Sequence, residues 1–245
     1  MKYFKNFQNH ADYEEYIESG EVLYPNVCWC NEEKDIHYDC VKPYISDGLV
    51  FHLDGEDCDG ATWTDRIGGV VFTMNDVVCD GESVYFKGNT NSYGQSSTVV
   101  NYSYNSSTIE VVILKQQQSG FVFDPVNASA IKYIQGGTNV NFTYGAAGKR
   151  SEITTQGLNK IITHSINMDR EIYNGKLLSF ATNDTWGAEG SGTFIGRRGG
   201  GGNPMKGNIY QIRIYNRKLT EEEILYNQEQ DRKRYGIVFE NTAEE

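Results

Sequence analysis

Residues 206–224 read KGNIYQIRIYNRKLTEEEI, and this stretch sets out a strand, a turn and a helix in immediate succession. Residues 208–215 alternate in character and are rich in β-branched and aromatic side chains, which is typical of a strand. Strict alternation gives the strand two faces, with Ile209, Gln211, Arg213 and Tyr215 on one and Tyr210, Ile212 and Ile214 on the other. Thr220 and Glu223 have the spacing of a capping box and Gly236 is a typical stop, so a short helix should follow.

The chain before this stretch, from Gly48 onward, is a series of short apolar segments separated by Gly, Asn, Ser and Asp. We expect strands at residues 49–53, 70–73, 83–86, 108–115, 121–123, 130–134, 139–144, 160–166, 170–173, 176–181, 192–196 and 208–215. The pair Asn174-Gly175 predicts a tight hairpin, because both residues tolerate positive φ. This pattern predicts an all-β fold, a two-sheet antiparallel jelly-roll sandwich with a short C-terminal helix.

The composition fits one large β domain and excludes several classes of protein. The chain has 245 residues, of which 38% are hydrophobic, and this is enough for a single core. Its 33 acidic and 22 basic residues give a formal net charge of −11. Nucleic acids and anionic membrane surfaces need a basic footprint, so we expect neither as a partner. No run of about 18 apolar residues is present, so we expect no membrane insertion.

Residues 1–47 differ in texture from the rest, and we assign them to a small helix-hairpin attachment. Residues 9–19 predict a short helix and residues 23–38 a hairpin, with too few apolar groups for a core of their own. We expect this segment to anchor the chain, with 48–237 as the jelly-roll domain and 238–245 as an acidic tail. The N-terminus lacks the apolar run of a signal peptide and the five cysteines are odd in number, so we expect cytoplasmic synthesis and reduced thiols.

Four segments carry a likeness to a known family. They are GLVFHLDG at 48–55 with TWTDRIGG at 62–69, His164 with IYNGK at 172–176, FIGR at 194–197, and the stretch 206–224. In this order they resemble the laminin-G-like, concanavalin A-like lectin/glucanase jelly-roll domains of bacterial and phage surface proteins. The resemblance covers residues 48–237, and it implies a lectin-like fold that binds carbohydrate.

A second resemblance concerns residues 23–38 and 231–237. They are similar to parts of structural proteins of phages that infect gut Bacteroides-type bacteria, the crAss-like group included. This resemblance implies a virion protein of the capsid or tail, made in the host cytoplasm and released by lysis. We expect a non-catalytic decoration or host-attachment protein. Residues 1–47 would contact other virion proteins, and the lectin-like domain would face host or gut glycans. Homo-oligomerisation is left open. The alternatives are a bacterial surface carbohydrate-binding protein and a polysaccharide hydrolase.

The hydrolase alternative can be tested on the strands themselves. Retaining glycosidases need two carboxylates about 5–5.5 Å apart, and the glucanases of this fold carry them at alternate positions of one strand, in a pattern such as E-x-D-x-x-E. No expected strand has this spacing. The nearest, residues 108–115, offers Glu110 alone. We therefore expect no catalytic residues and no enzymatic activity.

The acidic run DGEDCDG at residues 54–60 is the candidate metal site. Asp54, Glu56, Asp57 and Asp59 supply four carboxylates in a short loop, and Ca²⁺ prefers several oxygen ligands of this kind. The spacing does not match an EF-hand, and a solvated acidic turn with side-chain-to-backbone hydrogen bonds is the simpler interpretation. No cofactor other than this calcium ion is indicated.

Trp186 is the candidate sugar-binding residue. It lies in the polar stretch NDTWGA at residues 183–188. Its indole can stack on the apolar face of a sugar ring, while Asn183 and Asp184 bond to the sugar hydroxyls. An aromatic side chain that covers the rim of the sandwich is the alternative interpretation.

Overall fold

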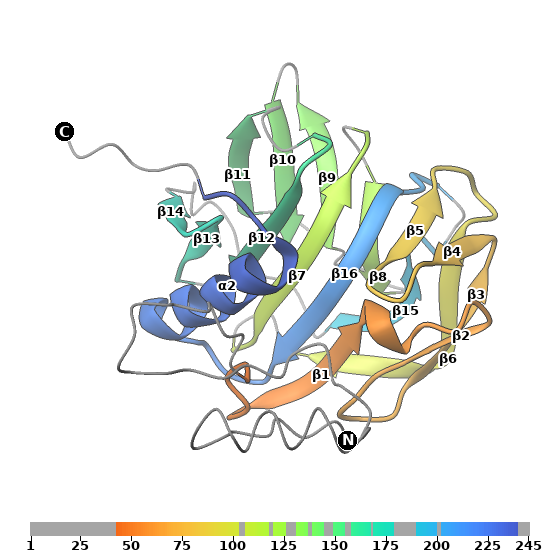
Figure 1. Ribbon diagram of the computed structural model, residues 1–245, viewed down its shortest axis with the longest axis horizontal. Helices are drawn as coiled ribbons and strands as arrows, with labels where there is room; N and C mark the ends of the chain where they lie inside the picture. The colour runs from red at the N-terminus through yellow and green to blue at the C-terminus, as the bar shows by residue number, and fades with distance from the viewer. Residues whose placement is uncertain are drawn as a thin grey trace, which may run out of the picture.

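The computed structural model describes most of the expected jelly-roll region. The described residues are 43–102, 106–117, 120–125, 131–136, 139–144, 149–154, 158–167, 169–178, 190–199 and 202–239. They form two antiparallel sheets stacked face to face, with a helix against the outer face of the first sheet (Figure 1). The predicted two-sheet sandwich with a C-terminal helix is therefore confirmed. The helix and hairpin expected within residues 1–42 lie outside the described residues.

The first sheet contains eight strands. In order across the sheet they are β14 (Lys176–Leu178), β13 (Glu171–Tyr173), β12 (Ile161–Ile166), β7 (Thr108–Lys115), β16 (Lys206–Tyr215), β5 (Val84–Lys87) and β4 (Val77–Cys79), and β1 (Leu49–Asp54) pairs with β16 beside β5. The long strand β16 makes this possible, because residues 206–209 pair with β5 and residues 211–215 with β1. The stretch that predicted the fold is thus the central strand of the first sheet.

The second sheet also contains eight strands. Their order is β11 (Lys149–Thr154), β10 (Asn139–Tyr144), β9 (Ile131–Gly136), β8 (Gly120–Pro125), β15 (Gly190–Ile195), β6 (Tyr93–Tyr102), β3 (Val71–Asn75) and β2 (Thr62–Thr64). A short 3₁₀ turn, η1 (Gly55–Asp57), leads from β1 toward β2 and so carries the chain from the first sheet to the second.

The core lies between the two sheets and is rich in aromatic rings. Phe51, Phe72 and Phe123 meet there with ring centroids 5.8 to 6.5 Å apart. Trp63 is fully buried, and its indole Nε1 donates a hydrogen bond of 2.6 Å to the backbone carbonyl of Asp54. Aromatic pairs of this kind contribute about 1 kcal/mol each beyond the area that they bury.

Strand β16 departs from strict alternation. A bulge between Ile209 and Gln211 puts Ile209 on the core side together with Ile212 and Ile214, while Tyr210 packs on the outer side beneath the helix. The faces predicted for Ile209 and Tyr210 are therefore wrong. An extra residue in one strand reverses the facing of the side chains on one side of it, and the sequence pattern does not reveal where it falls.

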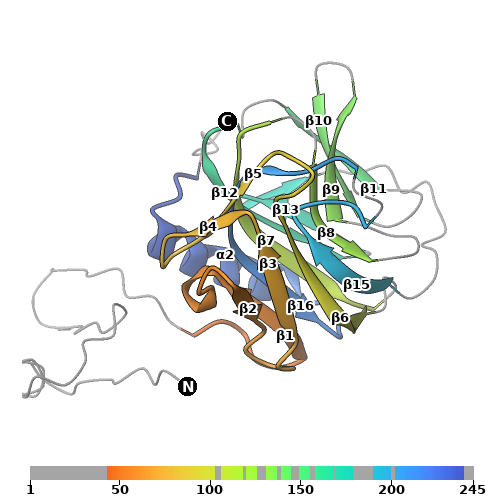
Figure 2. The same ribbon diagram turned by 90° about the vertical axis from the view of Figure 1, so that its right-hand side faces the viewer.

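Helix α2 (Glu221–Tyr235) covers the outer face of the first sheet. The predicted capping box is present: the Glu223 backbone N–H donates to Thr220 Oγ1 at 3.3 Å, and the Thr220 N–H donates to the Glu223 carboxylate at 2.9 Å. Gly236 ends the helix in the left-handed conformation, with φ of 62°. Figure 2 shows α2 and strands β9–β11 on opposite sides of the molecule. Within the described residues, no helix has the length and apolar character needed to cross a membrane.

Charged side chains fill the contact between α2 and the sheet. Arg213 on β16 is fully buried, pairs with both oxygens of Asp231 on α2 at 2.7 Å, and donates to Glu110 on β7 at 2.9 Å. Asn227 on α2 donates to the same Glu110 at 2.9 Å. A buried ion pair adds little net stability but is costly to break, so it specifies how two elements fit together. We call these four residues the helix network.

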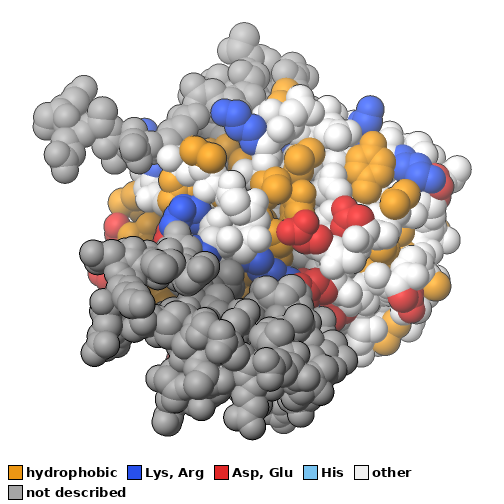
Figure 3. All heavy atoms as spheres, viewed as in Figure 1, with side chains coloured by type: hydrophobic (Ala, Val, Ile, Leu, Met, Phe, Trp, Pro, Cys, Tyr) orange, Lys and Arg blue, Asp and Glu red, His pale blue; other side chains and the backbone are white. Residues whose placement is uncertain are grey.

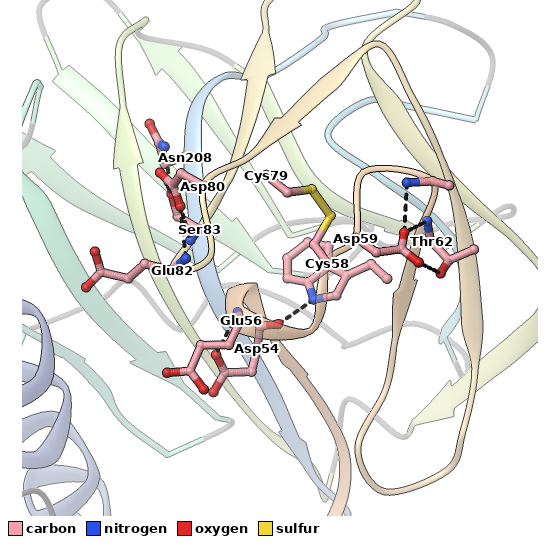
Figure 4. The surroundings of a disulfide bond; sticks show 12 residues. Asp54, Glu56, Cys58, Asp59, Thr62, Cys79, Asp80, Glu82, Ser83 and Asn208 are labelled. Carbon is pink, nitrogen blue, oxygen red and sulfur yellow. Dashed lines mark hydrogen bonds between the residues drawn. A yellow bond between two sulfur atoms is a disulfide. The ribbon is translucent and has the colours of Figure 1, made fainter. Parts of the chain in front are cut away.

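A disulfide joins Cys58 to Cys79 (Figure 4). It links the turn after β1 to the edge strand β4, across 21 positions of sequence, with the two Cα atoms 5.9 Å apart. That separation is within the range that a disulfide requires. The expectation of reduced thiols is therefore wrong for this pair. An odd number of cysteines excludes only that all of them are paired. Cys58 and Cys79 come together through the packing of strands that are distant from each other in the sequence.

The folded domain begins before Gly48. Tyr44, which we assigned to the N-terminal attachment, places its ring 4.0 Å from the guanidinium carbon of Arg213 and edge-on to His52, with centroids 5.9 Å apart. The Ile45 backbone N–H donates to a helix side chain at 3.0 Å. This short segment closes the open side of the helix network, so it belongs structurally to the sandwich.

Candidate functional site

A pocket of about 450 Å³ opens at the edge of the first sheet, where the β13–β14 hairpin meets the segment after α2. Its lining residues are Lys160, Ile161, Tyr173, Asn174, Lys176, Gly236, Ile237 and Val238, and we call it the hairpin pocket. Figure 1 shows the chain after α2 running back past β13 and β14, which brings these distant parts of the sequence together. Pockets of this size with apolar walls and a few polar groups are typical of small-ligand sites.

The tight turn between β13 and β14 builds one wall of the pocket. Asn174 and Gly175 both have positive φ, 46° and 78°, which confirms the hairpin predicted from this pair. The Asn174 backbone N–H donates to the Thr163 carbonyl at 3.0 Å, and its side-chain Oδ1 accepts from the Thr163 N–H at 2.9 Å. The Gly175 N–H donates to Gln228 Oε1 on α2 at 2.7 Å. The turn is therefore fixed to both β12 and α2.

The residues after α2 build the opposite wall. The left-handed Gly236 reverses the chain, and the N–H groups of Gly236 and Ile237 both donate to the Arg232 carbonyl. Ile237 is buried in a small apolar cluster with Val112 on β7. Val238 is 80% exposed although it lines the pocket, so it lies beside the opening.

Four residues with polar side chains belong to the lining, namely Lys160, Tyr173, Asn174 and Lys176. Lys160 precedes β12, Lys176 begins β14, and Tyr173 lies between them in the sequence at the end of β13. Both lysines are exposed, whereas Tyr173 is partly buried. An apolar floor with two lysines beside it matches the needs of a sugar, which has apolar ring faces and many hydrogen-bonding groups.

A buried pair lies beside Tyr173, whose ring also packs toward the core side of the sheet. His164 Nε2 lies 2.5 Å from Glu171 Oε1, and both residues are at most 1% exposed. The rings of His164 and Tyr173 meet edge-on, with centroids 5.9 Å apart. This pair supports the pocket wall from inside the sandwich and is not accessible to a ligand.

The acidic turn expected to bind calcium is occupied by two arginines. Arg66 Nη1 and Arg234 Nη1 each lie 2.7 Å from Asp54 Oδ2, and Arg234 Nη2 lies 2.8 Å from Asp54 Oδ1. Arg66 also pairs with Asp57 at 2.5 Å, and Arg234 with Glu56 at 2.9 Å. Burial alone would raise the pKa of Asp54, but the two guanidinium groups outweigh it and lower that pKa. The oxygens that calcium would need are therefore already bonded to cations.

Asp59 points away from Asp54 and Glu56 (Figure 4). Its Oδ1 accepts from the Thr62 N–H at 2.6 Å and the Ala61 N–H at 2.8 Å, and these bonds lower its pKa. In the part of the chain that the structure describes, no group of three or more His, Cys, Asp or Glu side chains is arranged to hold a metal ion. The structure thus brings Asp54, Glu56 and Asp57 together as ion-pair partners, and leaves Asp59 as the side-chain-to-backbone turn of the simpler interpretation.

The other candidate residues have different outcomes. Trp186, Asn183 and Asp184 lie outside the described residues, so the sugar-stacking prediction stays a prediction. Glu110, the lone acid considered for catalysis, is fully buried and bonded to Arg213.

Sequence reasoning assigned the residues of the hairpin pocket to the fold and not to a site. The Asn-Gly turn and Gly236 were identified as turn and stop signals, and the two lysines were not singled out. The available signal was a pair of lysines flanking a hairpin in an acidic chain. Their approach to Ile237 depends on the helix doubling back over the sheet, which no local pattern indicates.

The sequence matches no protein-family model and no curated protein sequence. Its fold is similar to that of solved carbohydrate-active and receptor-binding proteins. Trypanosoma rangeli sialidase in complex with sialic acid gives a TM-score of 0.59 at 17% identity over 78% of this chain. This chain spans about a third of that sialidase, 34% of its length.

Two isolated domains give similar agreement. Domain 4 of AbnA, an extracellular arabinanase of Geobacillus stearothermophilus in complex with arabinotriose, has a TM-score of 0.55 at 17% identity, covering 72% of this chain and 96% of that domain. The receptor-binding domain of botulinum neurotoxin type G has a TM-score of 0.52 at 13% identity, covering 78% and 52%. The fold is therefore a concanavalin A-like β-sandwich, as the resemblance implied. None of these three structures is described as a virion protein.

Proposed function

We propose that this chain is a non-catalytic glycan-binding module and that the hairpin pocket is its binding site. The observation that carries the proposal is the pocket itself, a space of about 450 Å³ with an apolar floor and a few polar groups. The arabinanase domain, which was solved with arabinotriose and is matched over nearly its full length, supports a saccharide as the ligand.

The absence of catalysis is part of the proposal. Hydrolysis of a glycosidic bond needs two accessible carboxylates on either side of that bond. Glu110 and Glu171 are both fully buried and engaged with Arg213 and His164. In the turn after β1, Asp54, Glu56 and Asp57 are paired with arginines. These placements favour binding over cleavage.

The setting in which the module acts is also a proposal. The Cys58–Cys79 disulfide favours an oxidising environment, because reducing cytoplasms keep thiols free. A carbohydrate-binding protein of a cell surface fits this, and we place it ahead of the virion protein expected from residues 23–38. A virion protein displayed outside the cell stays the second candidate, on the sequence resemblance alone.

A glycan array followed by calorimetry tests the proposal. We expect the full chain to bind a restricted set of oligosaccharides and to release no reducing sugar from them. In a ¹⁵N-resolved titration, shifts should concentrate at residues 160–161, 173–176 and 236–238. Trp186→Ala serves as the comparison: it leaves affinity unchanged if the hairpin pocket is the whole site.

Two results would contradict the proposal. An array with no bound glycan would remove the function, and steady sugar release would replace it with a hydrolase. Shifts confined to other parts of the chain, together with loss of binding in Trp186→Ala, would keep the function but move the site to the segment around Trp186.

A further inference from the structure

The hairpin pocket has a charge opposite to that of the chain as a whole. The full sequence carries 33 acidic and 22 basic residues, a net charge of −11. The described lining of the pocket contains Lys160 and Lys176 and no carboxylate. On the face that Figure 3 shows, acidic, basic and hydrophobic side chains are mixed over the described surface. A group of positive charges without a carboxylate is therefore a local feature of this surface.

The two lysines also differ from two other exposed lysines, Lys218 and Lys87. Lys218 lies 3.0 Å from Asp169, and Lys87 pairs with Asp76. Lys160 and Lys176 form no ion pair with any residue that the structure describes. Within the described residues no carboxylate neutralises these two charges, and we take them as available to a ligand.

The backbone around the lysines is held in place before any ligand arrives. Lys176 directly follows the Asn174-Gly175 turn, which is tied to β12 by Asn174 and to α2 through Gln228. Lys160 immediately precedes Ile161, whose pairing with Leu114 of β7 begins the β12 ladder. Rigid attachment at both positions reduces the entropy that a ligand must overcome.

We propose that the hairpin pocket binds an anionic saccharide, with Lys160 and Lys176 recognising a carboxylate or sulfate group on the sugar while Ile161 and Val238 contact the ring. This inference rests on the glycan-binding function proposed above and adds the chemical class of the ligand. An ammonium group near the surface interacts with an anion with modest strength, and a partly enclosed pocket increases it. Two such contacts together give a preference of roughly tenfold over the matched neutral sugar.

Matched sugars distinguish the two sources of negative charge. Titrations with lactose, 3′-sialyllactose and lactose 3′-sulfate compare a neutral, a carboxylated and a sulfated ligand, and trigalacturonic acid with its methyl ester forms a second pair. We expect the acidic member of at least one pair to bind about tenfold more tightly at low salt, with the preference falling as ionic strength rises. The member that binds identifies carboxylate or sulfate as the anion.

Variants locate the effect. Lys160→Gln combined with Lys176→Gln should abolish the preference for acidic sugars. Lys87→Gln, in strand β5 near the opposite edge of the same sheet, should leave it unchanged. Equal binding of acidic and neutral members, or the same preference in the double variant, would overturn the inference. Binding of neutral sugars alone overturns the inference but keeps the proposed function, whereas no binding to any glycan removes both.

Discussion

His52 should make the stability of this domain sensitive to acid. The imidazole lies on the outer face of β1, only 6% exposed, beneath the ring of Tyr44. Burial, opposed by the carboxylate of Asp54 at 3.8 Å and reinforced by the guanidinium of Arg213, lowers the pKa of His52 from 6.5 to about 3. The folded protein therefore keeps this residue neutral throughout the mildly acidic range.

The sign and size of the effect follow from the two pKa values. In the unfolded chain His52 binds a proton below its ordinary pKa of about 6.5, whereas in the folded chain it does so only near pH 3. Above pH 6.5 both states hold His52 neutral, and the residue costs no stability. As the pH falls from 6.5 toward 3, the unfolded chain binds a proton that the folded chain does not, so the free energy of unfolding decreases. At pH 4.5, two units below the unfolded pKa, the loss is about 2.7 kcal/mol.

Two carboxyl groups of the same region titrate at low pH and must be separated from this effect. Burial raises the pKa of Glu110, so acid favours the folded state at that residue. The lowered pKa of Asp54 costs stability chiefly below its ordinary pKa of 3.8. Both contributions are present in the wild type and in His52→Gln, so the difference between the two proteins reports His52.

The measurement is urea unfolding of both proteins at pH 7.5 and pH 4.5, followed by intrinsic fluorescence. Between these pH values the wild type should lose about 2–3 kcal/mol more than His52→Gln. Equal m-values at pH 7.5 serve as the control that both proteins unfold from the same compact state. Equal losses in the two proteins would refute the argument, because they would show that His52 titrates alike when folded and unfolded.

Three further predictions concern the residues that hold the helix and the acidic turn. Asp231→Ala should lower the free energy of unfolding by about 3–5 kcal/mol in urea titrations, because it leaves Arg213 charged and buried without its bidentate partner. Replacing Cys58 and Cys79 together by Ser should cost about 3 kcal/mol, and a reducing agent should lower the melting temperature of the parent chain but not of this variant. Tyr44→Ala should cost about 2–3 kcal/mol in the same urea titrations, since it removes the ring that covers Arg213.

The sequence was most informative where a local pattern has one structural outcome. The capping box at Thr220 and the Asn174-Gly175 turn each depend on residues close together in the chain, and both appear as predicted. The alternation of residues 208–215 predicted a strand correctly but failed at Ile209 and Tyr210. A bulge is set by the pairing of β16 with β7, and this partner is far away in the sequence.

The site was less predictable for the same physical reason. Asp54, Glu56 and Asp57 are close together in the sequence, as a calcium loop requires, but arginines pair with all three. Arg234 reaches Asp54 and Glu56 across 180 positions of sequence from Asp54, and Arg66 pairs with Asp57. Likewise, Lys160 and Ile237 share a pocket although 77 positions of sequence separate them, because the chain turns at Gly236 after α2. Local spacing identifies which groups can act together, whereas long-range packing decides which of them do.

The helix network and the hairpin pocket are connected through α2. Gln228, one turn of helix before Asp231, accepts the Gly175 N–H of the hairpin and donates to Ser165 at 2.9 Å. The buried pair of Asp231 with Arg213 fixes the register of α2 on the sheet, and that register sets where Gln228 meets the hairpin. Polar groups buried at a helix–sheet contact therefore position both walls of the pocket, at little net gain in stability. A pocket held in this way is formed before a ligand arrives, and this is the condition that the proposed discrimination between sugars of different charge requires of Lys160 and Lys176.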